Sequence, residues 1–254
     1  MTIKSVCVLG GAGFVGRHLV RLLCAQDVAV RVPTRSIGTA RQALGSLPAE
    51  IVSADVHDAV QLVRLFDGMD AVINLVGILH EQDGETFRHV HVELPRKIIG
   101  AARDMSVARL LHMSALNAAP DGPSAYLRSK GEAEALVLTG GLQATIFRPS
   151  VIFGAEDKFL NLFARLAMWA PVMPLACADA KFQPVWVEDV ARAFVRSLED
   201  ASSVGQRYDL CGPQVYRLRE LAAFAAACRR RHPLIVPLSS PSPICRPPRW
   251  NCCG

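Results

Sequence analysis

The segment Tyr126-Leu127-Arg128-Ser129-Lys130 places a phenol and an ammonium group four residues apart. Residues at this spacing share one face of a helix, so both side chains can act on the same substrate atom. A phenol titrates near pH ~10, and a nearby cation favours its ionised form, which suits proton transfer at a carbonyl or carbinol. Ser114 ends an expected strand, and its hydroxyl can donate to the substrate oxygen. We therefore predict Ser114, Tyr126 and Lys130 as the catalytic candidates, with Tyr126 as the acid and base.

A glycine-rich turn near the start of the chain indicates which kind of cofactor such a site would use. The segment Gly10-Gly11-Ala12-Gly13-Phe14-Val15-Gly16 follows an apolar run and opens a helical one. Glycine permits a positive φ and lets the backbone approach a pyrophosphate, and a helix N-terminus offers free N–H groups. In this context the turn predicts a dinucleotide site. Its binding residues are Gly10, Gly13, Phe14, Val15 and Gly16.

The end of the second expected strand discriminates between the two nicotinamide dinucleotides. It has the sequence Val32-Pro33-Thr34-Arg35-Ser36, without the acid that usually holds the ribose hydroxyls of NAD(H). A guanidinium pairs well with a 2′-phosphate, which an acid would repel. We therefore favour NADP(H) over NAD(H) as the cofactor, with Arg35 as the phosphate ligand. The alternative is that Arg35 is a solvated surface residue.

Short β-type runs alternate with helical runs along the first two thirds of the chain, which is typical of parallel βαβ units. The fold class predicted is α/β, a Rossmann-type doubly wound parallel sheet with a small second lobe. The expected strands are Ser5–Leu9, Val28–Val32, Ile51–Ala54, Ala71–Val76, Leu110–Ser114, Ala144–Phe147, Pro184–Val187 and Arg207–Leu210. The expected helices are Val15–Ala25, Ala40–Leu47, Val60–Phe66, Leu94–Arg103, Tyr126–Leu138, Phe159–Trp169, Glu188–Leu198 and Leu218–Cys228.

The alternation weakens after Phe153, which sets the predicted domains. We assign residues 1–153 and 184–205 to the nucleotide-binding domain, and residues 154–183 and 206–228 to a small, short C-terminal lobe. Residues 229–254 contain six prolines and three cysteines and show no periodicity. We expect this segment to be an atypical tail, with a non-native reading frame as the hypothesis. A basic anchor for acidic lipid or a partner is the alternative.

The net charge of +5 comes from that last segment. Glu220 is the last acidic residue, whereas five arginines follow it, and residues 1–220 carry equal numbers of acids and bases. The body therefore has no basic surplus for nucleic acid, which we exclude as a partner. We expect no membrane-spanning helix, because no apolar run reaches about 18 residues. We expect no signal peptide, because the N-terminus has one lysine and continues directly into a strand and the glycine turn. The expected location is the cytoplasm.

Other chemistry-bearing side chains give weaker signals. The cysteines lie scattered in apolar segments without a CxxC pair, which favours reduced thiols. His89 and His91 lie two residues apart and cannot share a helix face, so with His80 they predict no metal site. We expect Glu134 to lie on a solvated face with its neighbour Glu132. Arg148 is either a ligand of a substrate phosphate or a structural partner of a carboxylate.

Taken together these motifs resemble the short-chain dehydrogenase/reductase superfamily, in its extended or atypical NAD-dependent epimerase/dehydratase branch. The resemblance spans about residues 4–228 and implies further contacts. Asp55 would bind the adenine amine and Val56 its ring, Val76 and Gly77 would flank the cofactor, Lys130 would hold the nicotinamide ribose, and Pro149 would lie by the carboxamide. The segments that carry it are Gly10–Gly16, Ala54–Val56, Asn74–Gly77, Ser114, Tyr126 with Lys130, Phe147–Gly154 and Val185–Ala191.

Three segments resemble more narrowly the subgroup that includes the NADPH-binding accessory subunit of respiratory complex I and its bacterial relatives. They are Val72–Leu79, Tyr126–Lys130 and Asp157–Asn161. In the mitochondrial subunit of this subgroup the nucleotide is thought to be structural. Resemblance to this subgroup and its bacterial relatives implies a bacterial protein. It also implies, besides the cytoplasm, a location at the periphery of the inner membrane.

Three functions remain open at this point. The first is an NAD(P)-dependent oxidoreductase or epimerase/dehydratase acting on a small molecule of unknown identity. The second is a non-catalytic NADPH-binding accessory or assembly subunit associated with respiratory complex I. The third is a regulatory module that senses the redox state of the cofactor.

Overall fold

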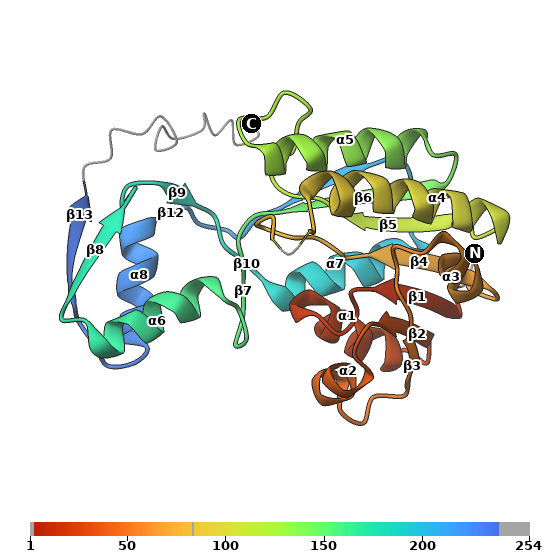
Figure 1. The fold of residues 1–254 in the computed structure, drawn as a ribbon. Helices are drawn as coiled ribbons and strands as arrows, with labels where there is room; N and C mark the ends of the chain where they lie inside the picture. The colour runs from red at the N-terminus through yellow and green to blue at the C-terminus, as the bar shows by residue number, and fades with distance from the viewer. Residues whose placement is uncertain (1–2, 83, 239–254) are drawn as a thin grey trace. The chain divides into compact units, whose positions relative to one another are not determined.

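The computed structural model describes residues 3–82 and 84–238 (Figure 1). The backbone divides into two compact units, which are treated separately below. The first comprises residues 3–149 and 187–210, and the second comprises residues 150–186 and 211–238. Every predicted cofactor-binding and catalytic residue lies in the first unit.

A seven-stranded sheet forms the centre of the first unit, in the order β11-β6-β5-β4-β1-β2-β3. All of its strand pairs are parallel. The chain starts at β1 and builds outward on both sides, so the order reverses between β1 and β4, the position where open α/β sheets bind ligands. This confirms the predicted fold class. The strands are β1 (Ser5–Leu9), β2 (Ala29–Thr34), β3 (Ala49–Ser53), β4 (Ala71–Asn74), β5 (Arg109–Met113), β6 (Gln143–Pro149) and β11 (Arg207–Leu210).

Helices cover both faces of this sheet, because every parallel connection must cross it. Helices α3, α4 and α5 lie on one face, and α1, α2 and α7 lie on the other (Figure 1). Their bounds are α1 (Phe14–Cys24), α2 (Ile37–Leu44), α3 (Ala59–Phe66), α4 (Leu94–Asp104), α5 (Ala125–Thr139) and α7 (Val187–Glu199). The short 3₁₀ turn η2 (Ala201–Ser203) leads from α7 to β11.

The core of the first unit lies between the sheet and these helices. Strand β1 is almost entirely buried, and the side chains of Phe66, Leu94 and Ile98 from α3 and α4 pack in the same cluster. Burying one such side chain contributes about 1.5–3 kcal/mol. The strands are therefore held rigidly, and their carboxyl ends provide a fixed edge for a site.

One helical segment differs from the sequence expectation. The helical run that was predicted from Leu94 begins six residues earlier, at a π-helical stretch η1 (Arg88–Glu93) that continues directly into α4. Pro95 lies in the first turn of α4 and has no N–H for the regular hydrogen-bond ladder. The wider turn N-terminal to this proline places His91 on the inner, buried side.

The second unit has its own small core between α6 (Phe159–Trp169) and α8 (Leu218–Ala227). Three two-stranded sheets complete it. They pair β7 (Ile152–Phe153) with β10 (Val185–Trp186), β9 (Lys181–Phe182) with β12 (Tyr216–Arg217), and β8 (Val172–Ala176) with β13 (Leu234–Leu238).

The domain boundaries differ from those expected in several places. Residues 150–153 and 184–186, which include β7 and β10, were assigned to the nucleotide-binding domain but belong to the second unit. Strand β11 was assigned to the small lobe, but it pairs with β6 and is the edge strand of the main sheet. Strand β13 lies in the segment that was expected to be an atypical tail, yet it pairs with β8 over five residues. Residues 239–254 of that expected tail lie outside the described residues. Local periodicity could not show either pairing, because each joins segments that are distant in sequence.

Two other expectations concern thiols and membranes. Cys7, Cys24 and Cys228 are outside disulfides, whereas Cys177 is disulfide-bonded, which corrects the expectation of a reduced thiol at that position. Over the described part of the chain, no helix is long and apolar enough to cross a membrane.

Candidate functional site

The glycine turn joins β1 to α1 at the carboxyl edge of the sheet. Gly10 has φ +80°, a conformation that favours glycine, and its carbonyl accepts the N–H of Gly13 at 2.9 Å. A Cβ on Gly16 would lie 2.6 Å from the Cα of Gly11, so only glycine lets α1 approach the turn this closely. Gly13 is the N-cap of α1, and within residues 3–82 and 84–238 no side chain caps the helix, which leaves the N–H groups of Phe14 and Val15 at a helix end suited to a pyrophosphate.

Three further predicted residues lie where β2 and β3 end. Arg35 follows β2 directly and is exposed, with its Nη1 3.2 Å from Oε1 of Glu85. Asp55 is exposed after β3, and its Oδ1 accepts the N–H of His57 at 2.9 Å. Val56 is half-buried and packs against the core cluster. The predicted adenosine contacts therefore come from the ends of adjacent strands.

Lys130 lies at the centre of the site. Its side chain is only 3% exposed, and Nζ donates to the carbonyl of Met113 at 3.2 Å. Burial lowers the pKa of Lys130 to about 8, partly offset by the carboxylate of Glu134. A Cβ on Gly77 would lie 3.1 Å from Nζ, so the loop after β4 passes directly over the ammonium group. Val76 precedes this glycine, and its N–H donates to Oδ1 of Asn74 at 3.1 Å.

Tyr126 departs from the sequence expectation. Its ring packs edge-on against the rings of His91 and Phe87, with centroid distances of 5.5 and 5.8 Å. Burial raises the pKa of Tyr126 to about 12. Burial thus acts in the opposite direction to the lowering of this pKa that was expected from Lys130.

Ser114 also differs from the expectation that its hydroxyl donates to a substrate oxygen. It is buried, and its Oγ donates to Oε1 of Glu134 at 2.5 Å. Glu134, expected on a solvated face, is only 2% exposed and pairs with Arg148 and Arg207. The expectation for Glu134 is therefore wrong, and Arg148 is a structural partner of a carboxylate. Pro149 ends β6, and its carbonyl accepts the N–H of Leu116 at 3.0 Å.

Two buried histidines were missed as members of this site. His91 Nε2 accepts the N–H of Ile78 at 3.1 Å, so its Nδ1 carries the proton and donates to Ser129 Oγ at 2.9 Å. His112 Nδ1 lies 3.2 Å from Nδ2 of Asn74, and its Nε2 has no hydrogen-bond partner among the described residues. Burial and the charge of Lys130 lower the pKa of both imidazoles to about 3. These contacts span 38 residues for the Asn74–His112 and His91–Ser129 pairs, and no local pattern signals them.

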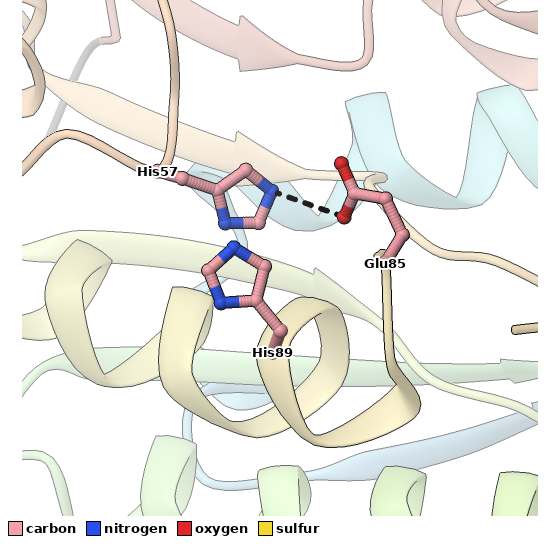
Figure 2. A group of neighbouring side chains, drawn as sticks. All are labelled: His57, Glu85 and His89. Carbon is pink, nitrogen blue, oxygen red and sulfur yellow. Dashed lines mark ion pairs between the residues drawn. The ribbon is translucent and has the colours of Figure 1, made fainter. Parts of the chain in front are cut away.

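His89 joins a different group from the one considered in the sequence. Figure 2 shows its ring lying against that of His57, with Glu85 beside them. The two rings stack at 4.2 Å with an interplanar angle of 17°, and His57 Nε2 lies 3.9 Å from Glu85 Oε2. Lone pairs of imidazole nitrogens lie in the ring plane, so two stacked rings cannot direct them at one ion. The group does not fit a metal in this arrangement.

The parallel sheet, the glycine turn where its strand order reverses and the buried lysine beside Gly77 define a pyridine-nucleotide-binding α/β fold. Residues 6–211 match the model of the family described as "NAD dependent epimerase/dehydratase family". The chain belongs to this family.

Individual relatives agree with this assignment. The chain is 34% identical over 241 residues to the mitochondrial NADH dehydrogenase (ubiquinone) 1 alpha subcomplex subunit 9 of Arabidopsis thaliana, covering 92% of this chain and 60% of the relative. It is also 34% identical to the subunit of the same name from Mus musculus, covering 91% of this chain and 63% of the relative. The chain thus spans less than two thirds of the length of these relatives.

Among solved structures, the chain resembles a UDP-glucose 4-epimerase from Thermus thermophilus in complex with NAD. The TM-score is 0.79 at 21% identity, over 92% of this chain and 86% of the epimerase. At this identity the likeness concerns the fold alone.

Proposed function

We propose that this protein is an NADP(H)-binding accessory subunit associated with respiratory complex I, in which the nucleotide stabilises the fold and is not turned over. One observation carries this proposal: the buried Ser114 hydroxyl is held by Glu134, while burial raises the pKa of Tyr126 to about 12. The Ser114 hydroxyl is thus engaged by a carboxylate inside the fold, and the Tyr126 phenol is buried and protonated at neutral pH. The names of the relatives from Arabidopsis thaliana and Mus musculus, both subunits of NADH dehydrogenase, support the same role.

The residues that would hold the nucleotide follow the carboxyl ends of neighbouring strands. When bound, the nucleotide would supply a hydride-transferring ring, and this chain's own residues bind and orient it. The pyrophosphate would lie on the turn and helix end of α1, where free N–H groups favour an anion. The remaining contacts we propose are Arg35 to the 2′-phosphate, Asp55 and Val56 to the adenine, Val76 and Gly77 along the cofactor, Lys130 to the nicotinamide ribose and Pro149 to the carboxamide.

Arg35 supports the finer proposal of NADP(H) rather than NAD(H). Its guanidinium is exposed at the end of β2, and β2 itself ends without an acid. A 2′-phosphate on this residue would form a charge-assisted, two-pronged hydrogen bond.

The test is nucleotide content and affinity of the natively purified full chain. We expect NADP(H) to be retained, and the stripped protein to bind NADPH at least about tenfold more tightly than NADH. Arg35→Ala should remove most of this difference, whereas Arg41→Ala, an exposed arginine on the neighbouring α2, should leave it unchanged. Tighter binding of NADH than of NADPH by the wild type would refute the preference.

The second candidate function is an oxidoreductase or epimerase/dehydratase acting on a carbonyl or carbinol. The observation in its favour is that Tyr126 and Lys130 lie one turn apart on α5. The ring of Tyr126 contacts that of His91, and Nζ of Lys130 and Nε2 of His91 both lie close to Gly77. Acting as a general base, Tyr126 would need a pKa well below about 12 in the working complex, whereas as a general acid it would donate from the protonated form.

Tyr126→Phe separates the two candidates. An accessory subunit should keep its bound nucleotide and should still co-purify with the respiratory complex after this change. An enzyme should lose turnover of NADPH with small carbonyl substrates by about a hundredfold or more. Turnover by the wild type that depends on Tyr126 would replace the accessory role with the catalytic one.

A further inference from the structure

The carboxylate that β2 lacks is supplied by another part of the chain. Glu85 lies in the loop between β4 and η1, fifty residues after Arg35, and its Oε1 lies 3.2 Å from the guanidinium. The Arg35 side chain is 75% exposed, whereas that of Glu85 is 28% exposed. The arginine is therefore free to turn toward a ligand, while the glutamate is the more fixed partner.

Several contacts hold Glu85 in this place. Its backbone forms a bridge with Gln82, with hydrogen bonds of 2.9 and 3.3 Å. Its second oxygen, Oε2, faces His57 Nε2 at 3.9 Å, as Figure 2 shows. His57 is in turn fixed by its stacking on His89 and by its N–H bond to Asp55.

Glu85 thus lies between Arg35, which follows β2, and the segment of Asp55 that follows β3. These are the two positions proposed above for the 2′-phosphate and the adenine. A carboxylate here has opposite effects on the two nucleotides. It can accept a hydrogen bond from the 2′-hydroxyl of NAD(H), but it repels a 2′-phosphate and occupies the guanidinium that the phosphate needs.

We propose that Glu85 is a specificity-determining residue, which competes with the 2′-phosphate of NADP(H) for Arg35 and thereby weakens NADP(H) binding relative to NAD(H). The inference rests on the proposed nucleotide site. It adds that the ratio of the two affinities is set by a pair, Arg35 and Glu85, and not by the strand end alone. Binding of NADP(H) must then break the Arg35–Glu85 contact, whereas binding of NAD(H) leaves it in place.

The test is the affinity of stripped full-length protein for NADPH and NADH, with Glu85→Gln as the central variant. Glutamine keeps the shape of the side chain and removes its charge. We expect NADPH to bind about threefold to tenfold more tightly, and NADH to change by less than about twofold. An equal change for both nucleotides, or weaker NADPH binding, would overturn the inference.

Two controls show whether the change in NADPH affinity caused by Glu85→Gln depends on Arg35. Glu93→Gln removes a charge that contacts His89 and Arg88 but not Arg35, and it should leave the affinity ratio unchanged. In an Arg35→Ala background, Glu85→Gln should no longer favour NADPH. If the change persists without Arg35, competition for the guanidinium is refuted.

The same titrations distinguish this inference from the proposed function. A wild type that prefers NADPH but does not respond to Glu85→Gln leaves the function standing and rejects the inference. A wild type that prefers NADH, with a ratio that moves toward NADPH in Glu85→Gln, rejects the NADP(H) preference and supports the inference. A protein that binds neither nucleotide rejects both.

Discussion

At the scale of single residues, Lys130 shows how a residue of the proposed nucleotide site opposes stability. Its ammonium group is buried at 3% exposure with one carbonyl as hydrogen-bond partner, and burial lowers its pKa from 10.5 to about 8. Between pH ~8 and ~10.5 the unfolded chain holds a proton that the folded chain has released. The free energy of unfolding therefore rises with pH across this window, and below it the full destabilisation remains.

Lys130→Met should accordingly stabilise the nucleotide-free protein. We expect the free energy of unfolding at pH 7 to increase by about 1–3 kcal/mol, because a buried cation is replaced by an apolar chain of similar length. The gain should shrink toward pH 10.5, and nucleotide affinity should fall because the proposed ribose ligand is lost. Urea unfolding at pH 7 and 10 measures the first effect. A variant that is less stable at pH 7 would show that the lysine contributes to the apo fold.

At the scale of elements, the position of α5 decides where Tyr126 and Lys130 lie. Ser124 caps the helix by accepting the N–H of Leu127 at 3.2 Å. Gly131 lets the helix contact the loop after β5, since a Cβ there would lie 2.6 Å from the Cα of Ala119. The helix is thus fixed in angle by its cap and in depth by this glycine.

Gly131→Ala tests this arrangement against a matched substitution. The methyl group would meet backbone atoms, so α5 must shift, and we expect a loss of stability of about 2–4 kcal/mol together with weaker nucleotide binding. Gly100→Ala in α4 is the control, because a Cβ there meets nothing within 4 Å. It should raise stability by about 0.5–1 kcal/mol through helix propensity. Thermal unfolding of both variants measures the contrast, and equal effects would contradict the close-packing argument.

At the scale of the whole first unit, two buried neutral histidines make the fold sensitive to acid. The pKa values of His91 and His112 are lowered from 6.5 to about 3. Between pH ~3 and ~6.5 the unfolded chain binds protons at these histidines that the folded chain does not bind. The free energy of unfolding therefore decreases as the pH falls below ~6.5.

His112→Gln should flatten this dependence. Each histidine contributes up to about 1.4 kcal/mol per pH unit between pH ~6 and ~4, and the variant removes one contribution. The measurement is the slope of the unfolding free energy with pH, which does not depend on the stability lost by the substitution itself. The same slope in wild type and variant would show that His112 is protonated in the folded protein or titrates normally.

The sequence alone predicted most of the elements of the first unit. In this unit the bounds of β1 and β11 match the expectation and other elements shift by a few residues, because apolar periodicity depends only on neighbouring residues. The turn around Gly10 and Gly16 was predictable for the same reason, since its geometry excludes larger residues locally. Parallel pairing then places every strand's carboxyl end, and hence the site, at one edge of the sheet.

Tertiary structure decided the burial, the pKa values and the charged partners of the side chains in the candidate site. Burial of Glu134 against Ser114 and the raised pKa of Tyr126 both arise when separate segments exclude water together. The pairing of Glu85 with Arg35 joins residues fifty positions apart. Periodicity shows which side of an element is apolar, but not which charge from another element lies opposite it. The sequence by itself therefore determined the fold and the place of the site, and long-range contacts alone determined its electrostatics.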